Sequence, residues 1–216
     1  MARTQLVYPK MPASNAAPLG PCIAFEKCDG TNIHWCWDSS LGWYAFGTRR
    51  DRFDLDEGGI ADFNRAHLGL EQCVAIFLTT LEQSLSKRLR ELNYYNCEQL
   101  IVFTEFLGEQ SFAGKHLATD TKRLVIIDLQ TSNGFLAPES FVRDLDGLPI
   151  ARVVYRGKLT GKFADDVREG RYAVNEGVVC KGETDGSVWM AKIKTNGAYK
   201  IRLKEAFKDN WEEFWE

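Results

Sequence analysis

Charged residues stand inside segments of this 216-residue sequence that are otherwise apolar. The set comprises Lys27, Glu105, Glu176, Lys181, Lys192 and Lys194. One such residue alone is expected on the solvated face of a sheet. The whole set favours a nucleotide site, because lysines neutralise phosphates and carboxylates hold Mg²⁺. A lysine whose pKa is lowered by nearby cations can also attack phosphorus as a free amine.

The alternation of side chains along a strand predicts which of these residues share a face. Side chains two residues apart on a strand lie on the same side of the sheet. Lys192 and Lys194 are therefore expected to point the same way, and so are Glu176 and Val178.

The segment around Lys27 reads as a hairpin. Asp29 and Gly30 form a dipeptide that is typical of tight β-turns, and apolar, strand-like residues flank it at 23–27 and 31–37. We therefore expect these two segments to pair with each other, with Lys27 beside the turn.

The remaining pattern predicts an α+β protein dominated by antiparallel strands. Apolar residues at helical spacing predict one long helix over residues 70–92. Further strands are expected at 43–51, 98–108, 123–130, 151–157, 176–182 and 188–195, and shorter helices at 138–145, 163–169 and about 200–215. Residues 1–21 are expected to be an extended lead-in, and 22–216 a single domain.

Composition excludes several functional classes. The six cysteines form no C-x-x-C pair, and the three histidines have no spacing typical of a metal site or a catalytic triad. The start of the chain lacks the apolar stretch of a signal peptide and no run is long enough to span a bilayer, so a cytoplasmic protein without membrane contact is predicted. The segment GKLTGKF at 157–163 lacks the spacing of a phosphate-binding loop, and we expect a turn and a helix start there.

Five short motifs occur in an order that resembles the covalent nucleotidyltransferases, and in particular the ATP-dependent RNA ligases. They are KCDGTN at 27–32, FGTRR at 46–50, FTEFLG at 103–108, EGVVCK at 176–181 and AKIK at 191–194. The resemblance implies a nucleotidyltransferase (adenylation) domain of mainly antiparallel sheets flanked by helices, similar to ATP-grasp folds. It also implies ATP and Mg²⁺, or Mn²⁺ in its place, as cofactors.

The resemblance also implies roles for individual residues. Lys27 would be the nucleophile, and the other residues assigned to catalysis would be Asp29, Glu176, Lys192 and Lys194. The residues that would bind the nucleotide are Glu26, Lys27, Asn32, Arg49, Glu105, Ile127, Lys181, Lys192 and Lys194, with Glu176 and Asn32 near the metal. Arg50 is an alternative to Arg49 as the motif arginine.

Two departures from the family pattern bear on function. The family stacks an aromatic side chain on adenine, whereas the matching stretch here is LVIID at 124–128, so Ile126 or Ile127 would pack on the base instead. Few residues follow Lys194, so we expect no OB domain and a minimal catalytic domain, to which a partner protein could add an accessory domain.

The resulting hypothesis is an ATP-dependent RNA ligase that joins 5′-phosphate and 3′-hydroxyl ends, with nicked duplex RNA favoured over single strands. Two alternatives remain open. One is a protein that binds nucleotides or RNA ends without turnover, and the other is an adenylyltransferase or ligase that acts on DNA ends.

Overall fold

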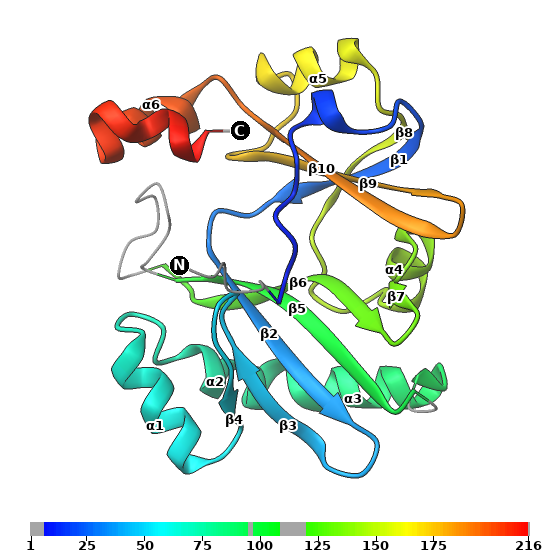
Figure 1. Ribbon diagram of the computed structural model, residues 1–216, viewed down its shortest axis with the longest axis vertical. Coiled ribbons are helices and arrows are strands. Elements are labelled where there is room, and N and C mark those ends of the chain that lie inside the picture. The colour runs from blue at the N-terminus through cyan, green and yellow to red at the C-terminus, as the bar shows by residue number, and fades with distance from the viewer. Residues whose placement is uncertain (1–6, 95–96, 109–119, 216) are drawn as a thin grey trace, which may run out of the picture.

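Two antiparallel sheets, one above the other, organise the computed structural model, which describes residues 7–94, 97–108 and 120–215 (Figure 1). The smaller sheet has the strand order β10-β9-β1-β8, and the larger has the order β4-β3-β2-β5-β6-β7. This confirms the predicted α+β class with mainly antiparallel strands.

The four-stranded sheet combines segments that are far apart in the sequence. Its strands are β1 (Pro21–Lys27), β8 (Val153–Lys158), β9 (Gly177–Thr184) and β10 (Ser187–Lys194). The six-stranded sheet comprises β2 (Thr31–Asp38), β3 (Gly42–Gly47), β4 (Phe53–Asp54), β5 (Gln99–Leu107), β6 (Arg123–Thr131) and β7 (Gly134–Phe135).

Helices cover the lower face of the larger sheet and the upper face of the smaller one, and further helices lie at the sides of the molecule (Figure 1). They are α1 (Glu57–Ala66), α2 (Cys73–Ile76), η2 (Phe77–Leu81), α3 (Glu82–Glu91), α4 (Pro138–Asp144), α5 (Gly161–Arg168) and α6 (Ala198–Phe207), with 3₁₀ segments η1 (Ser14–Ala16) and η4 (Lys208–Phe214). The predicted long helix is confirmed as the continuous run α2-η2-α3, whose middle segment is a π-helix. Helix α1 was not predicted.

Each sheet buries its outer face in a core of its own. Beneath the six-stranded sheet, the Trp35 ring of β2 stacks on Phe77 of η2 with ring centroids 3.9 Å apart. Above the four-stranded sheet, Phe163 of α5 packs in a cluster with Ala24 of β1 and Cys180 of β9. On β9 and β10, Cys180 and Ile193 belong to this second core, so the adjacent Lys181, Lys192 and Lys194 lie on the inner face of the sheet.

The predicted hairpin at Lys27 is wrong. Strand β1 pairs with β8 and β9, whereas β2 pairs with β3 and β5 in the other sheet. The Lys-Cys-Asp-Gly segment therefore connects the two sheets. Gly30 does not adopt a positive φ. Packing explains why a glycine occupies position 30, because a Cβ there would lie 2.4 Å from the carbonyl oxygen of Phe106.

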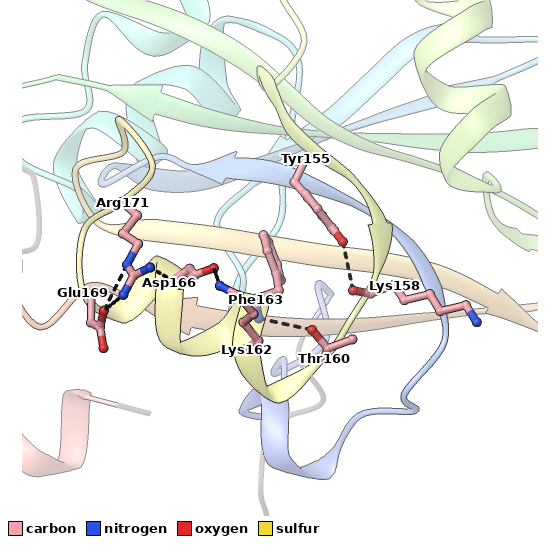
Figure 2. Close-up of polar contacts among 8 residues, drawn as sticks. All are labelled: Tyr155, Lys158, Thr160, Lys162, Phe163, Asp166, Glu169 and Arg171. Atoms are coloured by element: carbon pink, nitrogen blue, oxygen red, sulfur yellow. Dashed lines mark hydrogen bonds and ion pairs between the residues drawn. The ribbon is translucent and has the colours of Figure 1, made fainter.

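The GKLTGKF segment runs from the end of β8 into the start of α5, so the predicted helix start is confirmed, whereas no turn is assigned between them. The Thr160 hydroxyl accepts a hydrogen bond from the Phe163 amide at 3.1 Å and caps α5, as Figure 2 shows. Along the helix, Lys162 pairs with Asp166 at 2.8 Å (Figure 2). Lys162, the second of the two lysines of this segment, therefore has a structural partner.

The N-terminal segment does more than lead into the domain. The Tyr8 side chain is buried, and the Lys192 amide of β10 donates to the Pro12 carbonyl at 3.0 Å. The Val7 amide donates to the Arg49 carbonyl beyond β3, at 3.1 Å. Residues 7–14 thus run between the two sheets and contact both of them (Figure 1). Among the described residues, no helix has the length and apolar character that spanning a membrane requires.

Candidate active site

A pocket of about 510 Å³ lies between the inner faces of the two sheets. Its size falls within the range of small-molecule sites. Every site residue predicted from the sequence lines it: Glu26, Lys27, Asp29, Asn32, Arg49, Glu105, Ile127, Glu176, Lys181, Lys192 and Lys194. Residues from six strands and three connecting segments therefore converge on one cavity.

Strand register places Lys27 and Lys194 on either side of Glu176. In the four-stranded sheet, Gly177 of β9 stands opposite Lys27 of β1 and also opposite Lys194 of β10. Glu176 immediately precedes this glycine and is 3% exposed. Its Oε1 atom lies 2.7 Å from Lys27 Nζ and 3.7 Å from Lys194 Nζ.

Gly177 breaks the strand alternation at this point. It has a φ of +152°, and a Cβ on it would lie 2.0 Å from the Ile193 carbonyl oxygen, so the position requires glycine. The expectation that Glu176 and Val178 share a face is therefore wrong: Val178 is buried in the core beneath α5, whereas Glu176 faces the pocket. Lys192 and Lys194 both line the pocket, as predicted.

Lys27 is held in its charged form. Burial disfavours the ammonium, but the carboxylates of Glu176, Glu105 and Asp29 outweigh that effect and raise its pKa above the ordinary value. The neighbouring Cys28 thiol is kept protonated, because burial and nearby carboxylates raise its pKa to about 12. In the described site, Lys27 is thus an ion-paired cation, and its amine becomes nucleophilic only after it loses a proton.

The surroundings of Lys194 lower the pKa of its ammonium group. Burial, together with the charges of Lys27 and Lys192, lowers its pKa to about 8, although Glu176 opposes the shift. Its Nζ atom also lies 5.1 Å from the centroid of the Tyr199 ring. Burial and the adjacent carboxylates, Glu176 first, raise the pKa of the Tyr199 hydroxyl.

The six-stranded sheet contributes oxygen and amide groups to the same end of the pocket. Glu105 of β5 stands opposite Asn32 of β2. Burial, with the charges of Glu176 and Asp29, raises the pKa of Glu105 to about 7. Both polar atoms of the Asn32 side chain are shielded from solvent and form no hydrogen bond within the described part of the chain. A ligand in the pocket can supply the partners that this amide lacks.

A buried ion pair joins the two sheets at the other end of the pocket. Lys181 Nζ of β9 lies 2.6 Å from Asp128 Oδ1 of β6 and donates to the Ile127 carbonyl at 2.5 Å. Burial lowers the pKa of Lys181 despite the carboxylate. The Tyr8 hydroxyl donates to the second oxygen of Asp128, so the N-terminal segment completes this network.

A β-bulge decides which isoleucine faces the pocket. Strand β6 shifts register opposite Phe103 and Thr104 of β5, and Ile127 is the unpaired residue. Ile126 is fully buried in the main core, whereas Ile127 lines the pocket. Ile127 is therefore the isoleucine placed to pack against a bound base, with Phe25 and Val179 of the facing sheet.

Glu26 and Arg49 both line the pocket but have protein partners. Glu26 Oε2 lies 2.9 Å from Arg152 Nε. The Arg49 guanidinium donates to the carbonyls of Tyr8 and Pro9, at 3.1 and 2.9 Å from Nη2. Arg50 also lines the pocket and is exposed, so both candidates for the motif arginine border the site.

Sequence reasoning missed two tyrosines of the site. Tyr8 lies in the segment that was expected to be an extended lead-in, and Tyr199 lies in the first turn of α6, just before the residues at which the C-terminal helix was expected. Neither residue belongs to a motif. The available signal was modest: each tyrosine stands within a few residues of lysines, in a segment otherwise assigned no role.

The donor groups suit a magnesium ion better than a transition metal. Among residues 7–94, 97–108 and 120–215, no group of three or more His, Cys, Asp or Glu side chains is arranged to hold a metal. Magnesium needs no such cage, because it binds one or two carboxylates and takes its other ligands from phosphates and water. Glu176 and the unpaired amide oxygen of Asn32 are hard oxygen donors of this kind.

Comparison with known protein families and with curated proteins finds no match. Solved structures, in contrast, are similar over most of the chain. An archaeal ATP-dependent RNA ligase aligns with a TM-score of 0.58 and 19% identity, over 94% of this chain and 52% of its own. A Naegleria gruberi RNA ligase variant with ATP and manganese aligns with a TM-score of 0.62 and 15% identity, over 96% and 60%.

A putative ATP-dependent DNA ligase from Aquifex aeolicus is also similar, with a TM-score of 0.55 and 17% identity, over 96% of this chain and 56% of its own. The chain thus spans between half and three-fifths of the length of these three proteins. The likeness shows that the chain has the nucleotidyltransferase-domain fold of ATP-dependent ligases, as its motifs predicted.

Proposed function

We propose that the protein is an ATP-dependent RNA ligase that joins 5′-phosphate and 3′-hydroxyl RNA ends through a lysyl-AMP intermediate. The observation that carries the proposal is the contact of Lys27 with Glu176 at 2.7 Å, inside a pocket that also gathers Lys181, Lys192 and Lys194. A partly buried lysine beside further cations, on a ligase fold, fits nucleophilic attack on a phosphate.

The first step forms one bond and breaks one. The Lys27 amine, after losing its proton, attacks the α-phosphorus of ATP; the bond from that phosphorus to the bridging oxygen breaks, and pyrophosphate leaves. The AMP then passes to a 5′-phosphate end, and a 3′-hydroxyl displaces AMP to form the phosphodiester. In each transfer the protein acts mainly by positioning groups and stabilising charge.

The remaining residues of the pocket have assignable tasks. Lys192 and Lys194 would bind the phosphates, and Glu105 the ribose hydroxyls. Ile127, Phe25 and Val179 supply an apolar wall that supports base binding beside Lys181. A magnesium ion, when bound by Glu176 and Asn32, would supply positive charge next to the phosphates.

The test is transfer of label from α-labelled ATP to the protein, followed on a denaturing gel. We expect a labelled band with the wild type and none with Lys27→Ala. Lys87→Ala, which changes an exposed lysine of α3, serves as the matched control and should label normally. A band of equal intensity with Lys27→Ala, or none with the wild type, contradicts the lysyl-AMP intermediate. Competition by GTP and NAD identifies the nucleotide donor.

DNA ends are a second candidate substrate, favoured by the likeness to the Aquifex aeolicus protein. Nicked RNA duplex, nicked DNA duplex and single strands, each supplied with a labelled 5′-phosphate, distinguish the candidates. Sealing of nicked RNA supports the proposal, whereas preferential sealing of nicked DNA would identify DNA ends as the substrate instead. Nucleotide binding without any labelled adduct supports a binding protein instead.

A further inference from the structure

Arg202, in the middle of α6, is a cation with an incomplete set of hydrogen bonds. Its Nε and Nη2 atoms are shielded from solvent and donate to no group in the described part of the chain. Burying a guanidinium without acceptors is costly, because its hydrogen bonds to water are lost and nothing replaces them. A group of this kind is stabilised when an anion binds to it.

Arg202 lies next to the Lys27 end of the pocket. Its Cζ atom is 6.0 Å from the centroid of the Tyr199 ring, and Lys194 Nζ is 5.1 Å from the same ring. Tyr199 lines the pocket one helical turn before Arg202. Helix α6 lies beside the end of β10, on the opposite side of the molecule from α4 and β7 (Figure 1).

The lysines at this end of the pocket already have a carboxylate partner: Glu176 Oε1 lies 2.7 Å from Lys27 Nζ and 3.7 Å from Lys194 Nζ. Two arginines, Arg49 and Arg50, also line the pocket. A polyphosphate that enters adds several negative charges and needs further cations. The first turn of α6 contains no acidic residue, and its N-cap Gly197 offers no side-chain acceptor, so that turn places no carboxylate against an incoming anion.

We propose that Arg202 binds a phosphate group at the Lys27 end of the pocket, which is the end away from Ile127. The inference rests on the proposed function, which supplies two sources of phosphate there. One is the β- and γ-phosphates of ATP, which leave as pyrophosphate, and the other is the 5′-phosphate of the nucleic-acid end. Arginine suits either source, because its planar fork donates two parallel hydrogen bonds to phosphate oxygens.

The experiment measures binding of defined probes by titration calorimetry. The probes are inorganic pyrophosphate, AMP, and an RNA oligonucleotide with either a 5′-phosphate or a 5′-hydroxyl. The proteins are the wild type, Arg202→Gln, Arg202→Lys, and Arg65→Gln as a matched control at an exposed arginine of α1. Arg202→Lys keeps the positive charge and loses the planar fork.

If pyrophosphate is the ligand, Arg202→Gln weakens its binding at least tenfold and changes AMP binding less than twofold. If the 5′-phosphate is the ligand, Arg202→Gln abolishes the preference for phosphorylated RNA and leaves pyrophosphate binding unchanged. In both cases the affinity of Arg202→Lys for the phosphate probe lies between those of Arg202→Gln and the wild type, and the affinity of Arg65→Gln equals that of the wild type.

The proposal is overturned if Arg202→Gln binds both phosphate probes as tightly as the wild type, or if the wild type binds neither. It is also overturned if AMP binding falls as much as phosphate binding, because a purely structural arginine would affect all probes together. If Arg202→Gln does not fold, Arg202→Lys decides by the same comparison. The labelling test of Lys27 is separate, so failure of the ligase proposal can be told apart from failure of this one.

Discussion

The ion pair between Lys27 and Glu176 gives a stability prediction that tests the charge state of the nucleophile. The two charges lie 2.7 Å apart, and their side chains are 20% and 3% exposed. Coulomb's law with an effective dielectric constant of about 20 gives an attraction of about 6 kcal/mol. Desolvation offsets part of this, and Lys194 at 3.7 Å partly compensates when Lys27 is removed. We therefore expect a coupling free energy of about 3 kcal/mol.

The assay is a double-mutant cycle of Lys27→Met, Glu176→Gln and the double variant, with free energies of unfolding from urea titration near neutral pH. The exposed pair Lys87–Glu91, at 3.9 Å in α3, provides a control cycle. That cycle should give a coupling of less than about 0.5 kcal/mol, because solvent screens exposed pairs.

The pH dependence of the coupling follows from the shifted pKa. The folded-state pKa of Lys27 is raised above its ordinary value of 10.5. The pair therefore contributes its full stability below about 10.5, and the contribution is lost as the pH rises through the folded pKa. A coupling below about 0.5 kcal/mol at neutral pH, or one that disappears between about pH 7 and 9, would refute the view that Lys27 rests as an ion-paired ammonium.

Further predictions concern the glycines, Glu105, the N-terminal segment and the metal. Gly177→Ala should destabilise the fold by more than about 3 kcal/mol in urea titration, because its Cβ would meet a β10 carbonyl, whereas Gly186→Ala, with positive φ but open space, should cost about 1 kcal/mol. The pKa of Glu105 is raised from its ordinary 4.5 to about 7, so the fold loses stability as the pH rises through this range and the buried side chain becomes charged. Glu105→Gln should therefore raise the melting temperature more at pH 8 than at pH 5, and an equal rise at both pH values would contradict this. Tyr8→Phe should cost about 1–2 kcal/mol by removing a hydrogen bond from buried Asp128, and an unchanged urea midpoint would exclude that role. A chelator should abolish adduct formation from labelled ATP, and undiminished labelling would show that no divalent cation is needed.

The strands of the site could be predicted because their composition is two-sided. On β10, the buried Ala191 and Ile193 alternate with Lys192 and Lys194, which line the pocket, and this period of two is visible in the sequence. Apolar periodicity likewise identified α2-η2-α3. The short motifs selected the pocket residues because each motif lies at the end of a strand or in the connection beside it.

The partners of these strands could not be predicted from local sequence. The Asp29-Gly30 dipeptide favours a hairpin on local grounds, but β1 is paired by β8 and β9, which come more than a hundred residues later. Pairing of this kind depends on burial of whole sheet faces, which outweighs the preference of one turn. The expectation that Glu176 and Val178 share a face failed for a related reason. Gly177 interrupts the alternation of side chains between them, and its conformation depends on the close approach of β10.

The sign of the pKa shift at Lys27 constrains how the site can work. For attack on phosphorus the lysine has to lose its proton, yet Glu176, Glu105 and Asp29 hold that proton in place. The phosphates of ATP carry the same sign of charge as these carboxylates, so the nucleotide alone raises the pKa of Lys27 further. Positive charge has to accompany the nucleotide, either from outside the chain or from groups not matched by carboxylates. Arg202 is one group of the second kind, and Glu176 and Asn32 offer oxygen donors for the first. The carboxylates around Lys27 therefore keep the nucleophile protonated until nucleotide and cations are present together.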